Sequence, residues 1–521
     1  MKVFEISVLL TLLAIGNVYA QQDTYTAAVL EYSPILSGIS PTDNILKNSR
    51  AYVNYMINAK RQGVEIIVFP EDGLTGWDIG IENFDHVSTE VPDPSEKISP
   101  CIRTQHGNYS KFFVDLSCGA RDQRIYAVVN LIESSYTHDK KKIYYNTNVA
   151  FDRTGAVIAR YRKINLYDEP DHTVGDKSQV STFETDFGVK FGTFICFDIL
   201  FKYPAVNMLS DPTVTDIAYS VAWFSELPFF HSLSVQHGFA KSHGVNLLVA
   251  GMNNPAERNG GSGIYLHDGR IAETYLSGYR SSRLIIRQVP KIRARKDLSN
   301  TCQASSDTPR YTLEDVNFFR TKESDLSLYT FKSVDLNKKE LSDTVCSKGN
   351  NFCCSFNISI DKARDIRPNY AYKLTAFFGV TKVSLTKTIG LRNCGLIACL
   401  NESESSCGGR HTQPLIGVTF KSISVRGNFD TKDFHGQPAT LNFDMNPSTD
   451  YMYCTKTAND EQEISLSTTR PHNSLLTFGI VGRAFNHDDS AVRVISKANV
   501  NDVSIYLVLC ISIFVYLVQN E

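Results

Sequence analysis

The stretch Gly192-Thr193-Phe194-Ile195-Cys196-Phe197-Asp198 decides how the first half of this chain is interpreted. An apolar, strand-like run ends at Cys196, and a second apolar run, Ile199-Leu200-Phe201, follows it. This is an unusual position for a disulfide cysteine in an exported protein. The pattern therefore predicts that Cys196 is a thiol kept free for chemistry.

Two upstream segments supply partners for that thiol. A short apolar run leads into Phe69-Pro70-Glu71, and another β-like run ends at Lys163. Acyl transfer through cysteine needs a nucleophile, a group that moves its proton, and positive charge near the developing oxyanion. Glu71, Lys163 and Cys196 could divide these tasks at one edge of a sheet. Taken singly, they could equally be a solvated carboxylate, a surface lysine and an inert buried cysteine.

The first half of the chain alternates strand and helix signals, which predicts a layered α/β domain that ends near Pro290. Strands are expected at 26–31, 64–69, 125–132, 148–152, 156–161, 189–195 and 215–222. Helices are expected at 42–62 and 230–244.

Beyond about residue 300 the helical periodicity fades and short β-prone runs appear, such as 372–378 and 414–425. This predicts a second, disulfide-rich and mainly β domain. We expect a signal peptide at 1–20, a catalytic domain at 21–295, the β domain at 296–489 and a removed tail at 490–521.

The cysteine count fits an exported protein. Of twelve cysteines, Cys510 lies in the expected tail and Cys196 is the candidate nucleophile, which leaves ten for five disulfides. Cys101 with Cys118 is the only pair that stays within the first half of the chain. The remaining pairing stays open.

Both ends of the chain indicate the extracellular face of a membrane. An apolar stretch at 6–15 followed by Val18-Tyr19-Ala20 is typical of a signal peptide. The apolar run 503–518 is short for a membrane helix and resembles the signal for a glycolipid anchor, with Asp489 as the expected attachment site. A short single-span anchor is the alternative. The sequons at Asn108, Asn357 and Asn401 could carry glycans.

Composition and motifs exclude several function classes. The formal net charge is −2, and no basic tract calls for nucleic acid as a partner. The sequence has no Gly-x-Ser-x-Gly motif, P-loop or His-Glu-x-x-His helix. No metal or other cofactor is expected, and the expected partner is a small-molecule amide.

The segments 69–71, 161–163 and 194–198 resemble the Glu, Lys and Cys signatures of the nitrilase, or carbon-nitrogen hydrolase, superfamily. The longer matches 70–73, 162–167, 196–201 and 261–265 are similar to its biotinidase and vanin branch. In the second half, Phe352-Cys353-Cys354 and the segment 391–399 look like the cysteine framework of the vanin carboxy-terminal domain.

This resemblance implies an α-β-β-α sandwich and an amidase mechanism. Cys196 would attack an amide carbonyl to form a thioester, Glu71 would act as general base and then acid, and Lys163 would stabilise the tetrahedral intermediate. Glu169 matches a carboxylate that the branch places near the pocket, although a solvated loop carboxylate is the favoured alternative. Trp223 matches a pocket-lining segment, and a core tryptophan explains it almost as well.

The resemblance implies pantetheine as the substrate, cleaved to pantothenate and cysteamine. Biocytin is the alternative substrate, and a cysteine pair expected between Glu133 and Tyr144 is absent, which leaves the substrate open. The rival from another class is a surface glycoprotein that keeps this fold and binds a partner without catalysis.

Overall fold

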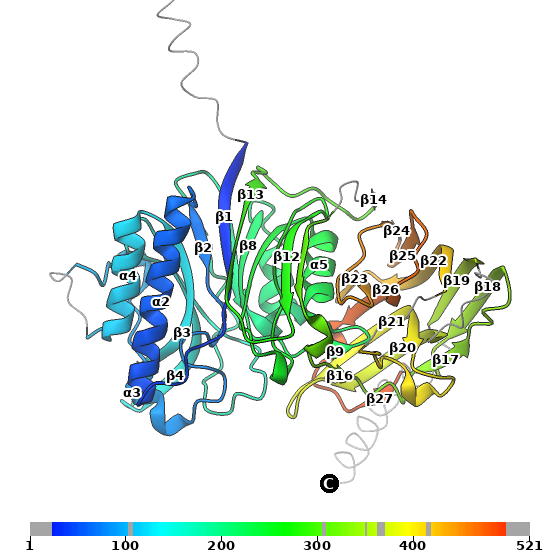
Figure 1. Cartoon of the computed structure of the whole chain (residues 1–521), viewed down its shortest axis with the longest axis horizontal. Coiled ribbons are helices and arrows are strands. Elements are labelled where there is room, and N and C mark those ends of the chain that lie inside the picture. Colours follow the sequence, from blue (N-terminus) through cyan, green and yellow to red (C-terminus); the bar gives the residue numbers. More distant parts are fainter. Residues whose placement is uncertain are drawn as a thin grey trace, which may run out of the picture.

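The computed structural model describes residues 23–102, 108–304, 309–349, 352–361, 370–412 and 418–495. Two β-sheets face each other in the first half of the chain, and helices cover both outer faces (Figure 1). The first sheet has the strand order β13-β1-β2-β3-β4-β5, and the second has the order β15-β12-β11-β10-β8-β7-β6. The predicted α-β-β-α sandwich is confirmed.

The expected strands and helices of this half are present, with ends shifted by a few residues. The first sheet contains β1 (Thr24–Glu31), β2 (Ile66–Val68), β3 (Tyr126–Tyr136), β4 (Lys142–Phe151), β5 (Val157–Arg162) and β13 (Arg283–Pro290). The second contains β6 (Thr182–Glu184), β7 (Lys190–Ile195), β8 (Asp216–Val221), β10 (Asn246–Gly251), β11 (Ser262–Tyr265), β12 (Ile271–Ser277) and β15 (Tyr311–Glu314).

Helices α2 (Pro41–Arg61) and α4 (Lys111–Gln123) pack on the outer face of the first sheet. The Ser40 hydroxyl caps α2 by accepting a hydrogen bond from the Asp43 N–H, and Pro41 suits the first helical position. Helix α5 (Ser232–His243) is almost wholly buried, because the second sheet lies on one side of it and the second domain on the other (Figure 1). The short helices are α3 (Phe84–Val87) and single turns at 81–83, 94–96, 196–200, 202–206, 255–257, 316–318, 404–406 and 485–487.

Alternating small and β-branched residues fill the space between the two sheets. Ala27 and Val29 of β1 meet Ala218 of β8 and Leu248 of β10 in one buried cluster. Because neighbouring residues of a strand point to opposite faces, Ala28 and Leu30 instead pack under the outer helices. The strand ends are thereby held in fixed positions where the two sheets meet.

The second domain is mainly β, as predicted, and it contains two sheets. One sheet contains β14 (Cys302–Ala304), β18 (Glu340–Cys346), β19 (Cys353–Asp361), β22 (Thr419–Asp430), β24 (Tyr451–Ala458) and β25 (Glu461–Thr468). The other contains β17 (Thr330–Ser333), β20 (Ala371–Lys382), β21 (Thr388–Cys399), β23 (Phe434–Asn442) and β26 (Leu475–Ala484), and β27 (Arg493–Val494) pairs with β20.

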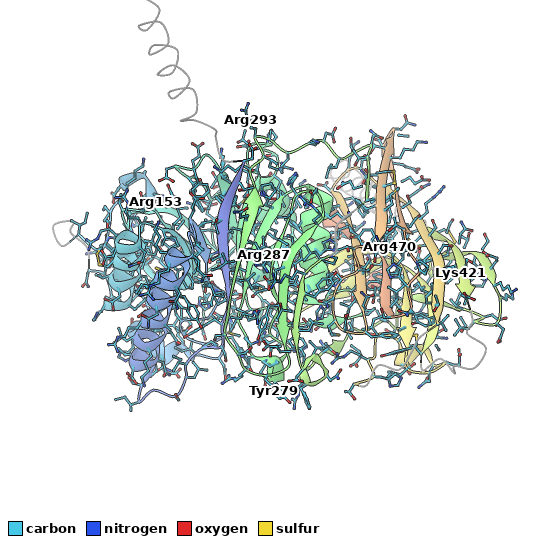
Figure 2. The ribbon with its side chains drawn as sticks, turned by 45° about the horizontal axis from the view of Figure 1, so that its top comes forward. Arg153, Tyr279, Arg287, Arg293, Lys421 and Arg470 are labelled. Atoms are coloured by element: carbon cyan, nitrogen blue, oxygen red, sulfur yellow. A yellow bond between two sulfur atoms is a disulfide. The ribbon has the colours of Figure 1, made fainter. Side chains whose placement is uncertain are left out.

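The second half of the chain also contributes to the first. Strand β15 extends the second sheet of the sandwich by pairing with β12. Strand β16 (Lys322–Glu323) pairs with β9 (Glu226–Leu227). Arg287 of β13 and Arg470 of the second domain mark the two halves in the tilted view of Figure 2. The halves are thus joined by backbone hydrogen bonds as well as by side chains.

The predicted five disulfides are present. They join Cys101 to Cys118, Cys302 to Cys454, Cys346 to Cys353, Cys354 to Cys394, and Cys399 to Cys407. Among the described residues, Cys196 is the one cysteine with a free thiol, and it is buried. No helix in the described part of the chain is both long and apolar enough to cross a membrane.

Candidate active site

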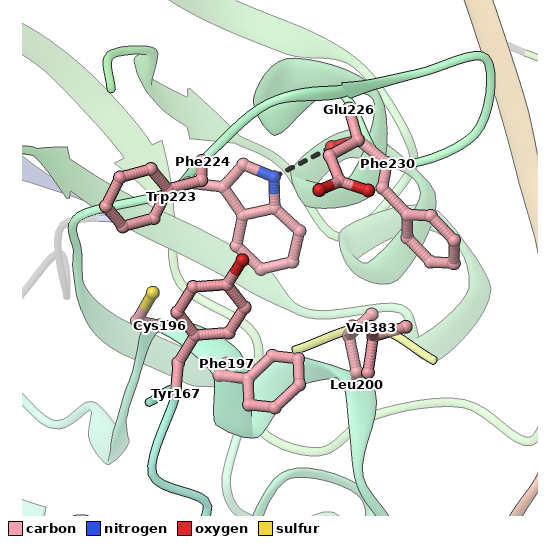
Figure 3. Close-up of a pocket in the computed structure, with 9 residues that line it drawn as sticks. All are labelled: Tyr167, Cys196, Phe197, Leu200, Trp223, Phe224, Glu226, Phe230 and Val383. Carbon is pink, nitrogen blue, oxygen red and sulfur yellow. Dashed lines mark hydrogen bonds between the residues drawn. The ribbon is translucent and has the colours of Figure 1, made fainter. Parts of the chain in front are cut away.

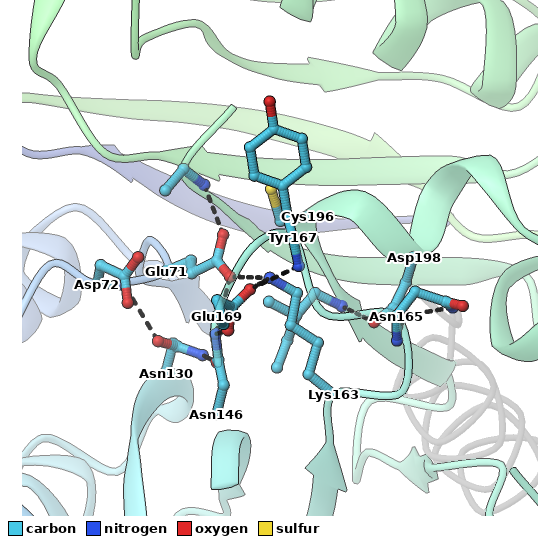
Figure 4. Close-up of polar contacts among 12 residues, drawn as sticks. Glu71, Asp72, Asn130, Asn146, Lys163, Asn165, Tyr167, Glu169, Cys196 and Asp198 are labelled. Carbon is cyan, nitrogen blue, oxygen red and sulfur yellow. Dashed lines mark hydrogen bonds and ion pairs between the residues drawn. The ribbon is translucent and has the colours of Figure 1, made fainter. Parts of the chain in front are cut away.

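Glu71, Lys163 and Cys196 lie together just past the ends of three strands (Figure 4). Glu71 follows β2, Lys163 directly follows β5, and Cys196 directly follows β7. All three side chains are at least nine-tenths buried. The structure therefore brings together the three residues that the sequence singled out, at the edge where the two sheets meet.

The backbone at Cys196 is held in a sharp turn. Its φ of 46° lies in the left-handed region, which is unfavourable for a residue with a side chain. The Tyr219 hydroxyl donates to the Cys196 carbonyl oxygen at 2.7 Å, and Cys196 begins the helical turn 196–200. These contacts fix the conformation that presents the thiol at the end of β7.

Asp198 ties this turn to the segment that carries the lysine. Its carboxylate accepts hydrogen bonds from the Tyr161 hydroxyl at 2.7 Å and the Asn165 side-chain amide at 2.8 Å. It also accepts from the Ile195 N–H at 3.1 Å. Burial raises the pKa of Asp198 to about 6, although these hydrogen bonds oppose the shift.

The Lys163 ammonium lies between two carboxylates. It donates to Glu71 Oε1 at 2.7 Å, and it is also paired with Glu169. The Asn146 amide donates to both carboxylates, at 2.9 Å to Glu71 and 3.0 Å to Glu169. Glu71 Oε2 accepts from the Ala222 N–H at 2.9 Å. Glu169 is therefore a half-buried member of this network, held by Lys163 and Asn146.

The surroundings of the site favour a neutral Cys196 thiol and a charged Lys163 ammonium. Burial and the neighbouring Glu71 carboxylate raise the pKa of the Cys196 thiol well above its usual value, although Lys163 opposes this. Burial disfavours the charge on Lys163, but Glu169 and Glu71 outweigh it and hold the lysine pKa well above its usual value. At neutral pH a neutral thiol thus lies near an oriented carboxylate and a cation. Such a site can attack a carbonyl and stabilise the resulting oxyanion.

A pocket opens in front of the thiol and is lined almost entirely by aromatic and aliphatic side chains (Figure 3). Its lining residues are Tyr167, Cys196, Phe197, Leu200, Trp223, Phe224, Glu226, Phe230 and Val383. The Trp223 indole N–H donates to the Phe230 carbonyl oxygen at 2.8 Å, which fixes the ring as one wall. Trp223 is both buried and part of the pocket, so the two alternatives for it are not exclusive.

The remaining predicted sites lie away from this pocket. Asn108, Asn357 and Asn401 are exposed. Asp489 is exposed, but its backbone N–H donates to the Thr388 carbonyl oxygen at 3.1 Å. No metal-binding group of His, Cys, Asp and Glu occurs among the residues that the structure describes. The expected signal peptide and the apolar run 503–518 lie outside the described residues.

Three contributors to the site were not singled out from the sequence. Asn146 and Tyr219 lie inside strands, where a single polar or aromatic residue carries no local signal. Asp198 lies in the motif around Cys196, but nothing local indicates that its carboxylate holds the turn. Glu71, Lys163 and Cys196 could be found because each one follows a β-like run.

Comparisons with known proteins identify relatives of both halves of the chain. The family model described as "Carbon-nitrogen hydrolase" matches residues 26–290, and the "Vanin C-terminal domain" model matches residues 319–488. The chain is 32% identical to Vanin-like protein 1 of Drosophila melanogaster, across 90% of this chain and 87% of that protein. It is 29% identical to the pantetheinase of Mus musculus, across 89% and 90% of the two chains.

Two solved structures that match are more distantly related. An amidase from Nesterenkonia sp. aligns with a TM-score of 0.39 and 17% identity, over 52% of this chain and 92% of the amidase. Nit3 of Saccharomyces cerevisiae, a member of the nitrilase superfamily, aligns with a TM-score of 0.41 and 19% identity, over 51% and 90% of the two chains.

Proposed function

Because the chain belongs to the carbon-nitrogen hydrolase family, with a vanin-type carboxy-terminal domain, and is an amide-cleaving hydrolase, we propose that it hydrolyses pantetheine to pantothenate and cysteamine. The observation that carries the mechanism is the buried cluster of Glu71, Lys163 and Cys196 at the end of an apolar pocket. The choice of substrate is supported by similarity to pantetheinases over most of the chain.

The first half of the reaction transfers the acyl group to sulfur. Glu71 takes the proton of the Cys196 thiol as the sulfur attacks the amide carbon, and Lys163 stabilises the oxyanion of the tetrahedral intermediate. Glu71 then gives the proton to the leaving nitrogen. The C–N bond breaks, cysteamine departs and a pantothenoyl thioester remains on Cys196.

The second half returns the enzyme to its starting state. Glu71 takes a proton from water as the water oxygen attacks the thioester carbon, and the C–S bond then breaks. The sulfur recovers the proton and pantothenate leaves. Asn146, Ala222 and Lys163 all donate to Glu71, which keeps its carboxylate oriented through both halves.

Glu169 is proposed as a positioning residue, because it pairs with Lys163 and does not line the pocket in front of the thiol. Trp223 is proposed to contact substrate as a pocket wall. The extracellular location, a glycolipid anchor and glycans at Asn108, Asn357 and Asn401 are further proposals that rest on sequence signals.

The test is cysteamine release from pantetheine by the purified wild-type protein and by Cys196→Ala, with biocytin as a parallel substrate. Release by the wild type alone supports the proposal. Cleavage of biocytin in place of pantetheine would reassign the substrate. No turnover of either amide by a folded sample would overturn the proposed function.

A further inference from the structure

One wall of the pocket in front of Cys196 comes from the second domain. Val383 belongs to the turn between β20 and β21, yet it lines the same pocket as Cys196 and Tyr167. In Figure 3 Val383 lies beside Leu200, across the pocket from the thiol. The candidate active site is therefore built from segments almost 200 residues apart in the sequence.

The turn that carries Val383 is fastened to the catalytic domain by one carboxylate. Asp168 accepts hydrogen bonds from the Leu385 N–H at 2.9 Å, the Thr386 N–H at 3.3 Å and the Thr386 hydroxyl at 3.3 Å. Asp168 itself has a left-handed backbone, with a φ of 52°. The conformation of this one residue thus supports all three contacts to the turn.

Asp168 lies between two residues of the site. Tyr167, before it, lines the pocket, and Glu169, after it, pairs with Lys163. The turn also has internal bonds, because the Val383 N–H donates to the Lys387 carbonyl oxygen at 3.1 Å and the Ser384 hydroxyl accepts from the Lys387 N–H at 3.1 Å. The segment 167–169 and the turn 383–387 therefore hold each other in place.

A second cavity adjoins this wall. It has a volume of about 590 Å³ and shares Tyr167, Glu226, Phe230 and Val383 with the pocket at the thiol. Most of its other lining residues belong to the second domain, among them Lys322, Ser324, Leu326, Tyr329, Thr381 and Leu391. The four shared residues, Val383 among them, therefore border the space between Cys196 and this cavity.

We propose that the second domain is part of the substrate site. Val383 limits the size of the group that an amide substrate carries next to its scissile bond, and Asp168 positions the turn that carries Val383. The inference rests on the proposed amide chemistry at Cys196 and deepens it. It favours linear amides that are slender near the carbonyl and carry their bulk farther out, where the cavity widens.

The test measures access to Cys196 without requiring turnover. Full-length protein is treated with iodoacetamide or with the bulkier iodoacetanilide, and alkylation of Cys196 is followed by mass spectrometry. In Val383→Ala we expect the rate ratio of the bulky to the small reagent to rise by roughly tenfold, as for one or two methyl groups in a tight pocket. Val383→Phe should lower the ratio. Val180→Ala, the same change at an exposed site that lines neither cavity, should match wild type.

The role of Asp168 has its own readout. Asp168→Gly removes the carboxylate but tolerates the left-handed backbone, whereas Asp168→Asn keeps one acceptor. We expect the glycine variant to raise the reagent ratio as Val383→Ala does, the asparagine variant to restore part of the selectivity, and the double variant with Val383→Ala to add little further change. A purely structural role would slow or speed both reagents alike.

The two ideas fail differently. If the reagent ratio changes less than twofold in both Val383 variants, the proposal that Val383 limits access to Cys196 is wrong, whether or not the protein cleaves pantetheine. If the ratio changes as expected but the protein does not cleave pantetheine, the role of Val383 is supported and the proposed substrate is wrong.

Discussion

The buried lysine of the candidate site offers a stability test with a defined magnitude. Lys163 is 1% exposed and is paired with Glu71 and Glu169. Lys163→Met keeps the length of the side chain but leaves the buried Glu71 and the half-buried Glu169 without their cation. Breaking a buried ion pair from one side costs about 3–5 kcal/mol of unfolding free energy. The double variant Lys163→Met with Glu169→Gln should recover about half of that loss, because one like charge is removed.

A matched control exists on helix α5. Lys241 is also fully buried, but burial lowers its pKa from 10.5 to about 8, with Asp268 opposing the shift. At about 1.4 kcal/mol per pH unit, the drop of 10.5 − 8 corresponds to a cost of about 3 kcal/mol for keeping this lysine charged. Lys241→Met removes this cost together with the contact of the ammonium over the Tyr451 ring, so it should lose much less stability than Lys163→Met. The same substitution is therefore expected to differ clearly in size at the two positions.

The assay is denaturant unfolding followed by tryptophan fluorescence, under conditions that keep the disulfides intact. The chain has two tryptophans, Trp77 and Trp223, and both lie in the first half, so the signal reports the catalytic domain. The reasoning is refuted if Lys163→Met lies within about 1 kcal/mol of wild type, or if Lys241→Met loses as much stability as Lys163→Met.

Three further predictions follow from groups around the site and in the core. Burial raises the pKa of Glu31 from 4.5 to about 7. The stability that protonated Glu31 contributes is therefore complete below pH 4.5 and is lost as the pH rises through 7, a fall of about 3 kcal/mol in the free energy of unfolding. Glu31→Gln should abolish this fall when unfolding is measured across that pH range. Tyr219→Phe leaves the buried Cys196 carbonyl without its donor, so we expect a loss of about 1–3 kcal/mol and a changed rate of Cys196 alkylation; wild-type values for both would contradict this. Cys196→Gly and Cys196→Ala should both be inactive. The glycine variant should be more stable than the alanine variant by about 1 kcal/mol of unfolding free energy, because φ at this position is 46°.

The parts of the site that could be predicted are those with a local signal. Glu71, Lys163 and Cys196 each end a run of strand-forming residues, and strand ends at one sheet edge lie close together in space. The number of disulfides also followed from the cysteine count, because one cysteine lies in a strand-to-helix turn and another in the apolar tail.

The other parts depend on contacts between distant segments. Asn146 reaches both carboxylates only because β4 pairs with β3 and β5 in one register, and the Lys163 N–H donates to the Asn146 carbonyl oxygen at 2.8 Å. Val383 enters the pocket only because a turn of another domain docks on Asp168. The residues next to Asn146 and Val383 give no local signal of either contact. The disulfide pairing could not be predicted either, because ten cysteines allow many pairings.

The short strand β27 has a consequence for processing of the chain. Arg493 and Val494 pair with Val380 and Gly379 of β20, and Ile495 is 3% exposed within the core of the second domain. Cleavage after Asp489 would remove these residues and leave part of the β20 backbone without its hydrogen-bond partners. Bare strand edges recruit other strands, so such trimming would create a surface prone to self-association. Residues 490–495 therefore act as a cover for this edge, and a chain end or lipid link beyond Ile495 would keep it closed.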